Sequence, residues 1–105
     1  MEPRAKKLDK VWTSDDKLLG LGQRLFHREE GVDPDLLLYK SYLEVENYEL
    51  GATYFVPTDF IDEPNNEDGD LRLSTSFREV LERTWARMPA FIARGEGLEE
   101  ALPDD

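Results

Sequence analysis

The chain has 105 residues, the length of a single domain, and its apolar fraction of 39% is enough for one small core. It contains no cysteine, which excludes a disulfide framework, a thiolate nucleophile and a cysteine-based zinc site. Its net charge of −11 repels phosphate backbones, so we expect no direct binding to nucleic acid.

The acidity itself has two explanations. One is solubility, because acidic surfaces are common among soluble proteins. The other is recognition of a basic protein surface, or mimicry of nucleic acid. No apolar run approaches the roughly 20 residues that a helix needs to cross a bilayer, and the polar leader at residues 1–9 has no apolar signal-peptide region. We therefore expect a soluble cytoplasmic protein without membrane insertion.

Two strands are predicted near the N-terminus. Leu8–Trp12 begins the first strand, the polar residues at 13–17 form a turn, and Leu18–Phe26 forms the second strand. Gly20 and Gly22 interrupt the second strand, which indicates a bulge or a barrel bend. A nucleotide-binding loop is the alternative, but the third glycine, the preceding parallel strand and the following helix are missing.

The only histidine, His27, opens a charged loop at residues 27–35. A histidine acts as a base or a ligand only with suitable partner groups, and apart from Glu29 and Glu30 the loop offers none. We expect His27 to lie on the surface without a catalytic or metal-binding role.

The central stretch predicts an antiparallel hairpin of Leu36–Val45 and Leu50–Val56, joined by the four polar residues at 46–49. The first segment is apolar on both alternating faces at its start and on one face later, which is typical of a half-buried strand. A helix is the rival interpretation, and the clustered aromatic residues favour the strand. Pro57 lacks a backbone donor, so it ends the second strand or places it at an edge.

The acidic loop at residues 62–70 invites a calcium interpretation. Aligning Gly69 with the glycine of an EF-hand loop places Pro64 and Thr75 where the two essential carboxylates belong. We therefore expect a solvated connector and assign no metal ligand, while weak binding of divalent cations stays open.

One short helix is predicted after a last strand at Leu71–Leu73. Ser76 and Glu79 form a capping box, and apolar residues follow at helical spacing. Pro89 disfavours helix at the residue before it, so the helix spans about 76–87. Its apolar stripe should pack on the sheet, because a short isolated helix needs tertiary burial.

The chain thus divides into three parts. The leader at 1–9 precedes a domain at 10–92, which contains the acidic loop at 62–70. The segment at 93–105 is acidic and poor in apolar residues, so we expect a flexible tail.

The order of these elements resembles the PRC-barrel superfamily, and most closely its short stand-alone bacterial members of unknown function. The opening hairpin is similar to the family's, although Asp16 stands where a turn glycine is common and the insertion at 62–70 is not a family hallmark. The residues that carry the resemblance are Val11-Trp12, Asp15-Asp16, Leu18-Leu19-Gly20, Leu36–Val45, Tyr54–Pro57 and Phe60-Ile61. The resemblance implies a mainly β fold: a small antiparallel β-barrel with one short C-terminal α-helix around 76–87.

The resemblance also implies an adaptor, because PRC barrels are known as assembly modules and not as enzymes. No functional residue can be carried over, since the shared positions are structural. Our first hypothesis is therefore a non-enzymatic module that binds another protein or itself. Aromatic residues are favoured anchors at interfaces, and ordinary core packing is the alternative for each candidate. The candidate contacts are Tyr39, Tyr42, Tyr48 and Trp85.

Self-association has its own candidate element. An edge strand ending at Pro57 would pair with a second copy to give a homodimer.

Two further functions remain as alternatives. The first is an acidic mimic that occupies the nucleic-acid site of a basic protein, motivated by the charge of −11. The second is a small hydrolase that uses Asp and Glu, but nothing singles out one carboxylate pair. Because no nucleophile, base and orienting group converge in the sequence, we assign no catalytic residue and no cofactor.

Overall fold

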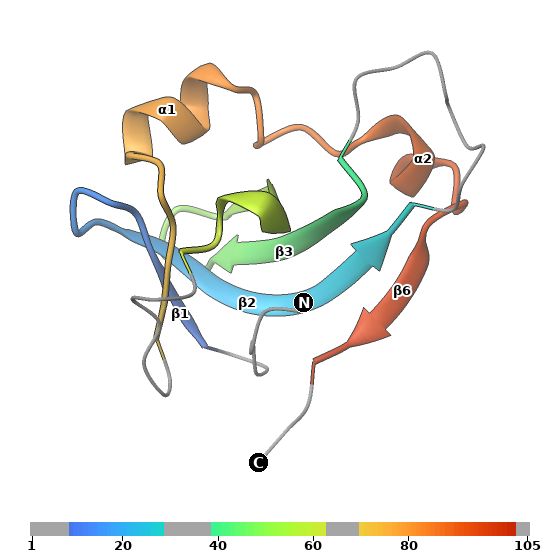
Figure 1. Cartoon of the computed structure of the whole chain (residues 1–105), viewed down its shortest axis with the longest axis horizontal. Coiled ribbons are helices and arrows are strands. Elements are labelled where there is room, and N and C mark those ends of the chain that lie inside the picture. The colour runs from blue at the N-terminus through green and yellow to red at the C-terminus, as the bar shows by residue number, and fades with distance from the viewer. Residues whose placement is uncertain (1–8, 29–38, 63–69, 103–105) are drawn as a thin grey trace.

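The computed structural model describes residues 9–28, 39–62 and 70–102. Within those residues the fold is mainly β, with six strands in one mixed sheet and two short α-helices (Figure 1). The strands are β1 (Lys10–Trp12), β2 (Leu18–His27), β3 (Ser41–Asn47), β4 (Ala52–Pro57), β5 (Asp70–Arg72) and β6 (Leu98–Ala101). The helices are α1 (Phe77–Glu82) and α2 (Ala90–Ala93), and a 3-10 turn, η1 (Thr58–Phe60), follows β4.

The long strand β2 organises the sheet. It pairs antiparallel with β3 along one side, and on the other side with β1 in its first half and β6 in its second half. The ladder skips Leu19 opposite β1 and Gln23 opposite β3, so β2 carries two bulges and curves strongly (Figure 1). The bulge predicted at the glycines is confirmed.

The first bulge of β2 requires a glycine at position 20. Its φ angle is +154°, and a Cβ atom added there would lie 2.5 Å from the backbone oxygen of Glu46. Any side chain would therefore push β3 away from β2.

The predicted central hairpin is confirmed as β3 and β4, which pair antiparallel around a turn at residues 48–51. Leu43 pairs with Val56 and Val45 pairs with Tyr54, and all four side chains are buried. The strand begins at Ser41, later than predicted, and residues 36–38 of the prediction lie outside the described part of the chain.

The sheet is open in the described residues, with the strand order β4-β3-β2-β1-β5 and β6 on the far half of β2. The prediction of an antiparallel sheet throughout is wrong for β5, which runs parallel to β1. The alternation of Leu71–Leu73 indicates a strand but carries no information on the direction of its neighbour. A short link joins the two ends of the sheet, because Asp62 N donates to Arg72 O at 2.7 Å and Ser74 N donates to Phe60 O at 2.8 Å.

The start of α1 agrees with its prediction. Glu79 N donates to Ser76 Oγ at 3.2 Å, and Ser76 N donates to Glu79 Oε1 at 3.1 Å, which confirms the capping box. Phe77 N also donates to Asp15 Oδ1 at 3.2 Å, so the turn between β1 and β2 anchors the first helical turn.

The end of α1 differs from its prediction at residue 87, because the helix stops at Glu82. Thr84 adopts a left-handed conformation with φ of 58°, Thr84 N donates to Leu81 O at 3.2 Å, and Trp85 N approaches Val80 O at 3.4 Å. This is the Schellman pattern, with threonine where glycine is usual. It turns Trp85 back into the core beside Val80. A second short helix, α2, then follows Pro89, where the prediction had one helix only.

The predicted flexible tail at 93–105 is wrong for Leu98–Ala101, which forms β6 on the edge of β2. Ionic contacts reinforce the backbone pairing: Arg24 lies 3.1 Å from Glu44 on β3 and 3.0 Å from Glu99 on β6. Leu102 then packs into the core. The low apolar content of the segment gave no sign of a strand. The strand forms because it pairs with β2, which lies in a distant part of the chain. The predicted leader up to residue 8, the acidic loop at 63–69 and residues 103–105 lie outside the described residues.

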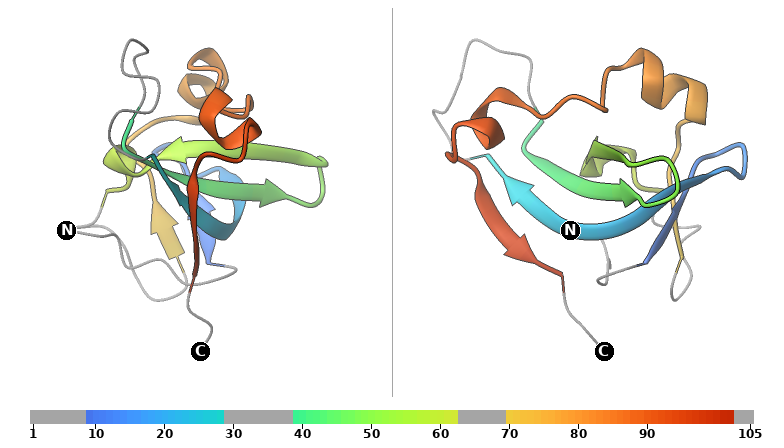
Figure 2. Two further views of the ribbon diagram at one scale, coloured as in Figure 1. Left: turned by 90° about the vertical axis from the view of Figure 1, so that its right-hand side faces the viewer. Right: turned by 180° about the vertical axis from the view of Figure 1, so that it is seen from behind.

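Buried side chains form two clusters. The main core comprises Val11, Leu19, Leu25, Leu43, Val45, Tyr54, Val56, Ile61, Leu71, Leu73, Val80, Trp85 and Leu102. The aromatic cluster comprises Tyr42, Phe55, Phe91 and Ile92, with Phe26 and Tyr39 packed against it. Both helices lie on the same side of the sheet, joined by a connection at residues 83–89 (Figures 1 and 2).

Candidate functional site

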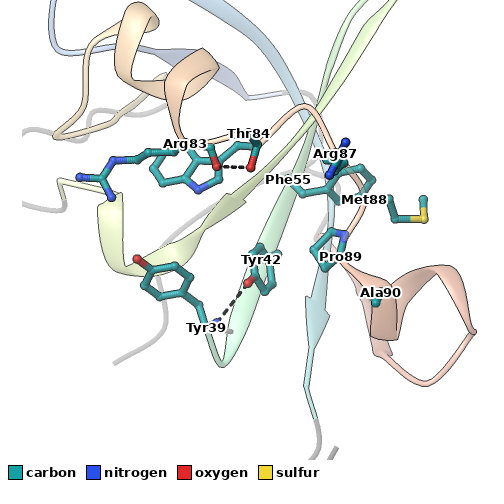
Figure 3. A pocket seen from close by; sticks show the side chains of 10 residues that line it. Tyr39, Tyr42, Phe55, Arg83, Thr84, Arg87, Met88, Pro89 and Ala90 are labelled. Atoms are coloured by element: carbon teal, nitrogen blue, oxygen red, sulfur yellow. Dashed lines mark hydrogen bonds between the residues drawn. The ribbon is translucent and has the colours of Figure 1, made fainter. Parts of the chain in front are cut away.

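A pocket of about 390 Å³ lies between the start of β3 and the connection that joins α1 to α2 (Figure 3). Pockets of this size accommodate a small ligand or one large side chain. It is lined by Tyr39, Tyr42, Phe55, Arg83, Thr84, Trp85, Arg87, Met88, Pro89 and Ala90. Three of the four predicted contact residues, Tyr39, Tyr42 and Trp85, therefore meet at one site.

The start of β3 supplies one wall. Tyr39 N donates a hydrogen bond to the Tyr42 hydroxyl at 3.0 Å, which fixes the approach of the chain to the strand (Figure 3). Burial raises the pKa of the Tyr42 phenol above its usual value, so the hydroxyl keeps its proton at neutral pH. Among the described residues nothing accepts that proton, which leaves it for a group bound in the pocket.

Aromatic rings of the two walls are linked by Phe60, which does not itself line the pocket. The ring centroids of Tyr39 and Tyr42 lie 6.2 Å apart, those of Tyr39 and Phe60 lie 5.6 Å apart, and both pairs meet edge to face. The rings of Phe60 and Trp85 follow at 4.9 Å. Edge-to-face contacts of this kind favour one arrangement of the rings, so the wall is formed before anything binds.

The opposite wall is the connection after α1. Phe55 N donates to Trp85 O at 2.7 Å, which fastens this connection to the outer edge of β4. The left-handed Thr84 turns Trp85 inward, where only 6% of the residue is exposed, and leaves Arg83 and Thr84 at the rim. A left-handed backbone is strained for a β-branched residue, with a cost on the order of 1–3 kcal/mol.

Two arginines give the pocket a positive character. The Arg83 guanidinium carbon lies 4.9 Å from the Phe60 ring centroid and 5.8 Å from the Trp85 ring centroid, within the range of cation–π attraction to both rings. Within the described residues no carboxylate forms an ion pair with Arg83 or Arg87. Four other arginines of the described residues form ion pairs with carboxylates, as Arg78 does with Glu82 at 2.9 Å: Arg24, Arg72, Arg78 and Arg94. Two arginines without a carboxylate partner in the described ranges thus line an aromatic pocket on a chain of net charge −11.

Tyr48, the fourth predicted contact, lies elsewhere. It is 62% exposed in the turn between β3 and β4, and its hydroxyl accepts a hydrogen bond from Gln23 Nε2 at 3.2 Å. It does not line the pocket.

Sequence reasoning missed Arg83 and Arg87 as site residues because it placed both within the helix predicted at 76–87, and it missed Met88, which follows that helix. The early end of α1 moves them into the connection that lines the pocket. The usual signal for such an end is a glycine, and here the position holds Thr84.

The prediction that His27 lies on a loop without partners is wrong. His27 ends β2, with Nδ1 2.8 Å from Ser41 Oγ and Nε2 2.6 Å from Glu100 Oε1. A serine, an imidazole and a carboxylate in a line invite a catalytic interpretation, but acyl transfer also needs oxyanion donors and a substrate cavity. The trio does not line the described pocket, and it joins three neighbouring strands. We interpret it as a fastening of β6 to the sheet.

Two carboxylates have shifted pKa values for structural reasons. Burial raises the pKa of Glu44, and the nearby Arg24 offsets part of that effect. A hydrogen bond from the Thr13 hydroxyl is the main cause that lowers the pKa of Asp15. Neither group lines the pocket. In the described ranges no three His, Cys, Asp or Glu residues are grouped to hold a metal ion, and no helix there has the length and apolarity to span a membrane.

Comparison of the chain with family models, with curated proteins and with solved structures finds no match in any of the three.

Proposed function

We propose that this chain is a non-enzymatic module that binds another protein through the aromatic pocket. One observation carries the proposal: Trp85 lines the same pocket as Tyr39 and Tyr42, although it lies more than 40 residues further along the chain. Aromatic anchors next to arginine are the residue types that dominate binding energies at protein interfaces.

The rigidity of the pocket supports this function. The Phe60 ring contacts the rings of both Tyr39 and Trp85, and the backbone of Trp85 is hydrogen-bonded to β4. Binding to side chains that are already ordered loses less conformational entropy than binding to free ones. A partner would therefore retain more of the energy of its contacts.

The resemblance to the PRC-barrel superfamily points the same way, since its members serve in assembly. We propose as well that the curled sheet is a variant of that barrel. The hydrogen bonds of Asp62 and Ser74, which link the two ends of the sheet, support this idea. They take the place that direct pairing of β4 with β5 has in a closed barrel.

Pairing of β4 edges between two copies receives less support. The Phe55 N–H, which faces away from β3, already donates to Trp85 O, and Pro57 has no N–H to donate. The edge offers few free donors to a second strand. The pocket is therefore the better candidate for assembly.

The proposal is tested by a pull-down from host lysate at low and high salt, with sizing of the purified protein alongside. We expect a protein that the wild-type chain retains at high salt, that Tyr39→Ala loses, and that the exposed-tyrosine control Tyr48→Ala retains. Retention by Tyr39→Ala would contradict the proposal. Capture of nucleic-acid-binding proteins at low salt only would instead support the acidic mimic.

A further inference from the structure

We infer that the pocket takes a short, extended protein segment that carries a carboxylate beside an apolar or aromatic side chain. This inference rests on the proposed function and names the chemistry of its partner.

The arginines require an anion. The Arg83 guanidinium carbon lies 4.9 Å from the Phe60 ring centroid and 5.8 Å from the Trp85 ring centroid. A guanidinium beside an aromatic ring still carries five N–H donors that an acceptor can bind. In the described part of the chain neither Arg83 nor Arg87 has a carboxylate partner. A carboxylate would form charge-assisted hydrogen bonds with either of them.

The same arginines exclude a cationic ligand. Aromatic pockets often bind ammonium groups through the faces of their rings. Here the Arg83 guanidinium already covers the Phe60 and Trp85 rings, and Arg87 adds a second positive charge. A methylated lysine or another basic side chain would meet repulsion from both.

The overall charge excludes a long polyanion. Charges interact weakly beyond the Debye length, which is about 8 Å at physiological ionic strength. The electrostatic energy of a single carboxylate near Arg83 or Arg87 is therefore set mainly by those two residues. A nucleic acid would extend past the pocket and meet the rest of a chain whose net charge is −11. A short acidic protein segment is the anion that fits.

The lining requires an apolar group next to that carboxylate. Tyr42, Phe55 and Pro89 present rings to the pocket, and Met88, which is 48% exposed, adds an adaptable thioether at its rim. Figure 3 shows Tyr39 and Tyr42 on one side of the pocket and the Arg83–Thr84 turn on the opposite side. The segment would insert one apolar side chain between these walls and present its carboxylate to the rim.

The test is selection of random dodecapeptides displayed on phage against the immobilised full-length chain, followed by affinity measurements with synthetic copies of the enriched peptides. We expect enrichment of Asp or Glu within a few positions of an aromatic or aliphatic residue. The variant Arg83→Gln with Arg87→Gln should weaken binding at least about tenfold, the value of one lost charge-assisted hydrogen bond. The control Arg78→Gln, on an exposed arginine outside the pocket, should change it less than about twofold.

Two further measurements separate a loss of positive charge from a loss of folding as the cause of weaker binding. The variant Arg83→Lys with Arg87→Lys keeps the positive charge and should retain part of the affinity, while circular dichroism confirms that each variant is folded. Basic or uncharged consensus peptides, or acidic peptides that bind the Gln variant as tightly as wild type, would overturn the inference. If no peptide binds although lysate capture depends on Tyr39, the inference falls and the proposed function stands. If lysate capture is also independent of Tyr39, both fall.

Discussion

The main core and the aromatic cluster pack on the same curved sheet but differ in composition and closure. The main core is mostly aliphatic, and Val11, Leu19, Leu43 and Val45 are completely buried. The aromatic cluster consists largely of rings and lies at the pocket, which Tyr42 and Phe55 line. Trp85 belongs to the main core and also lines the pocket. The main core therefore specifies the fold, whereas the aromatic cluster leaves an open pocket beside it.

The largest effect should come from the bulge in β2. Gly20→Ala should destabilise the fold by about 4 kcal/mol, because an added Cβ both strains the backbone and overlaps the Glu46 carbonyl. Urea unfolding measures the change. Gly51→Ala is the matched control, since Gly51 also has a positive φ of 64° but has nothing within 4 Å of an added Cβ. It should cost about 1 kcal/mol. Equal effects at the two positions would mean that β2 and β3 do not approach closely at Gly20.

Truncation in the main core should have the next largest effect. Leu43→Ala should cost about 3 kcal/mol of unfolding free energy, because it opens a cavity among fully buried side chains. Met88→Ala, at the rim of the pocket, should cost about 0.5 kcal/mol or less. Denaturant unfolding of both variants tests whether the main core contributes more to stability than the pocket region does. A large loss at Met88 would show that the pocket region also holds the fold.

A smaller effect of opposite sign is expected at the turn after α1. Thr84→Gly should stabilise the protein by about 1 kcal/mol, because glycine adopts the left-handed conformation without the strain of a β-branched residue. Thermal unfolding measures the gain. The affinity of the pocket for the selected acidic peptides should change little, since the turn at residues 83–85 keeps its shape. Destabilisation by glycine would indicate that the Thr84 side chain contributes more than its backbone conformation costs.

The smallest effect is a dependence on pH. Burial raises the folded-state pKa of Glu44 above its unfolded value, so the protonated form is favoured by folding. Its contribution to stability is present below the unfolded pKa and is lost as the pH rises through the folded pKa. Glu44→Gln should therefore gain stability relative to wild type as the pH rises from below to above the ordinary pKa of a glutamate, which is about 4.3. Chemical unfolding of both proteins across this range checks the sign, and a relative loss would contradict it.

Much of the sheet could be predicted from local patterns. Alternating apolar residues indicated β3, turn residues and apolar runs indicated β2 and β4, the paired glycines indicated the bulges, and Ser76 with Glu79 marked the start of α1. These features depend on residues close together in the chain. The predicted anchors Tyr39, Tyr42 and Trp85 also line one pocket, whereas Tyr48 does not.

Strand β6, the end of α1 and the arginines of the pocket could not be predicted, because they depend on tertiary contacts. Strand β6 exists because β2 offers it a free edge and basic partners, which the segment LEEA does not reveal by itself. The end of α1 is set by burial of Trp85, which forces Thr84 into a conformation that its residue type disfavours. The arginines of the pocket follow from that early end, so sequence periodicity could not identify them.

One measurement tests the central claim most directly: amide chemical-shift changes in the full chain on titration with the partner protein that the pull-down retains at high salt. The account predicts that the largest changes occur at Tyr39, Tyr42 and residues 83–90, which line the pocket. Changes confined to β6, or to the turn at residues 48–51 around Tyr48, would contradict it.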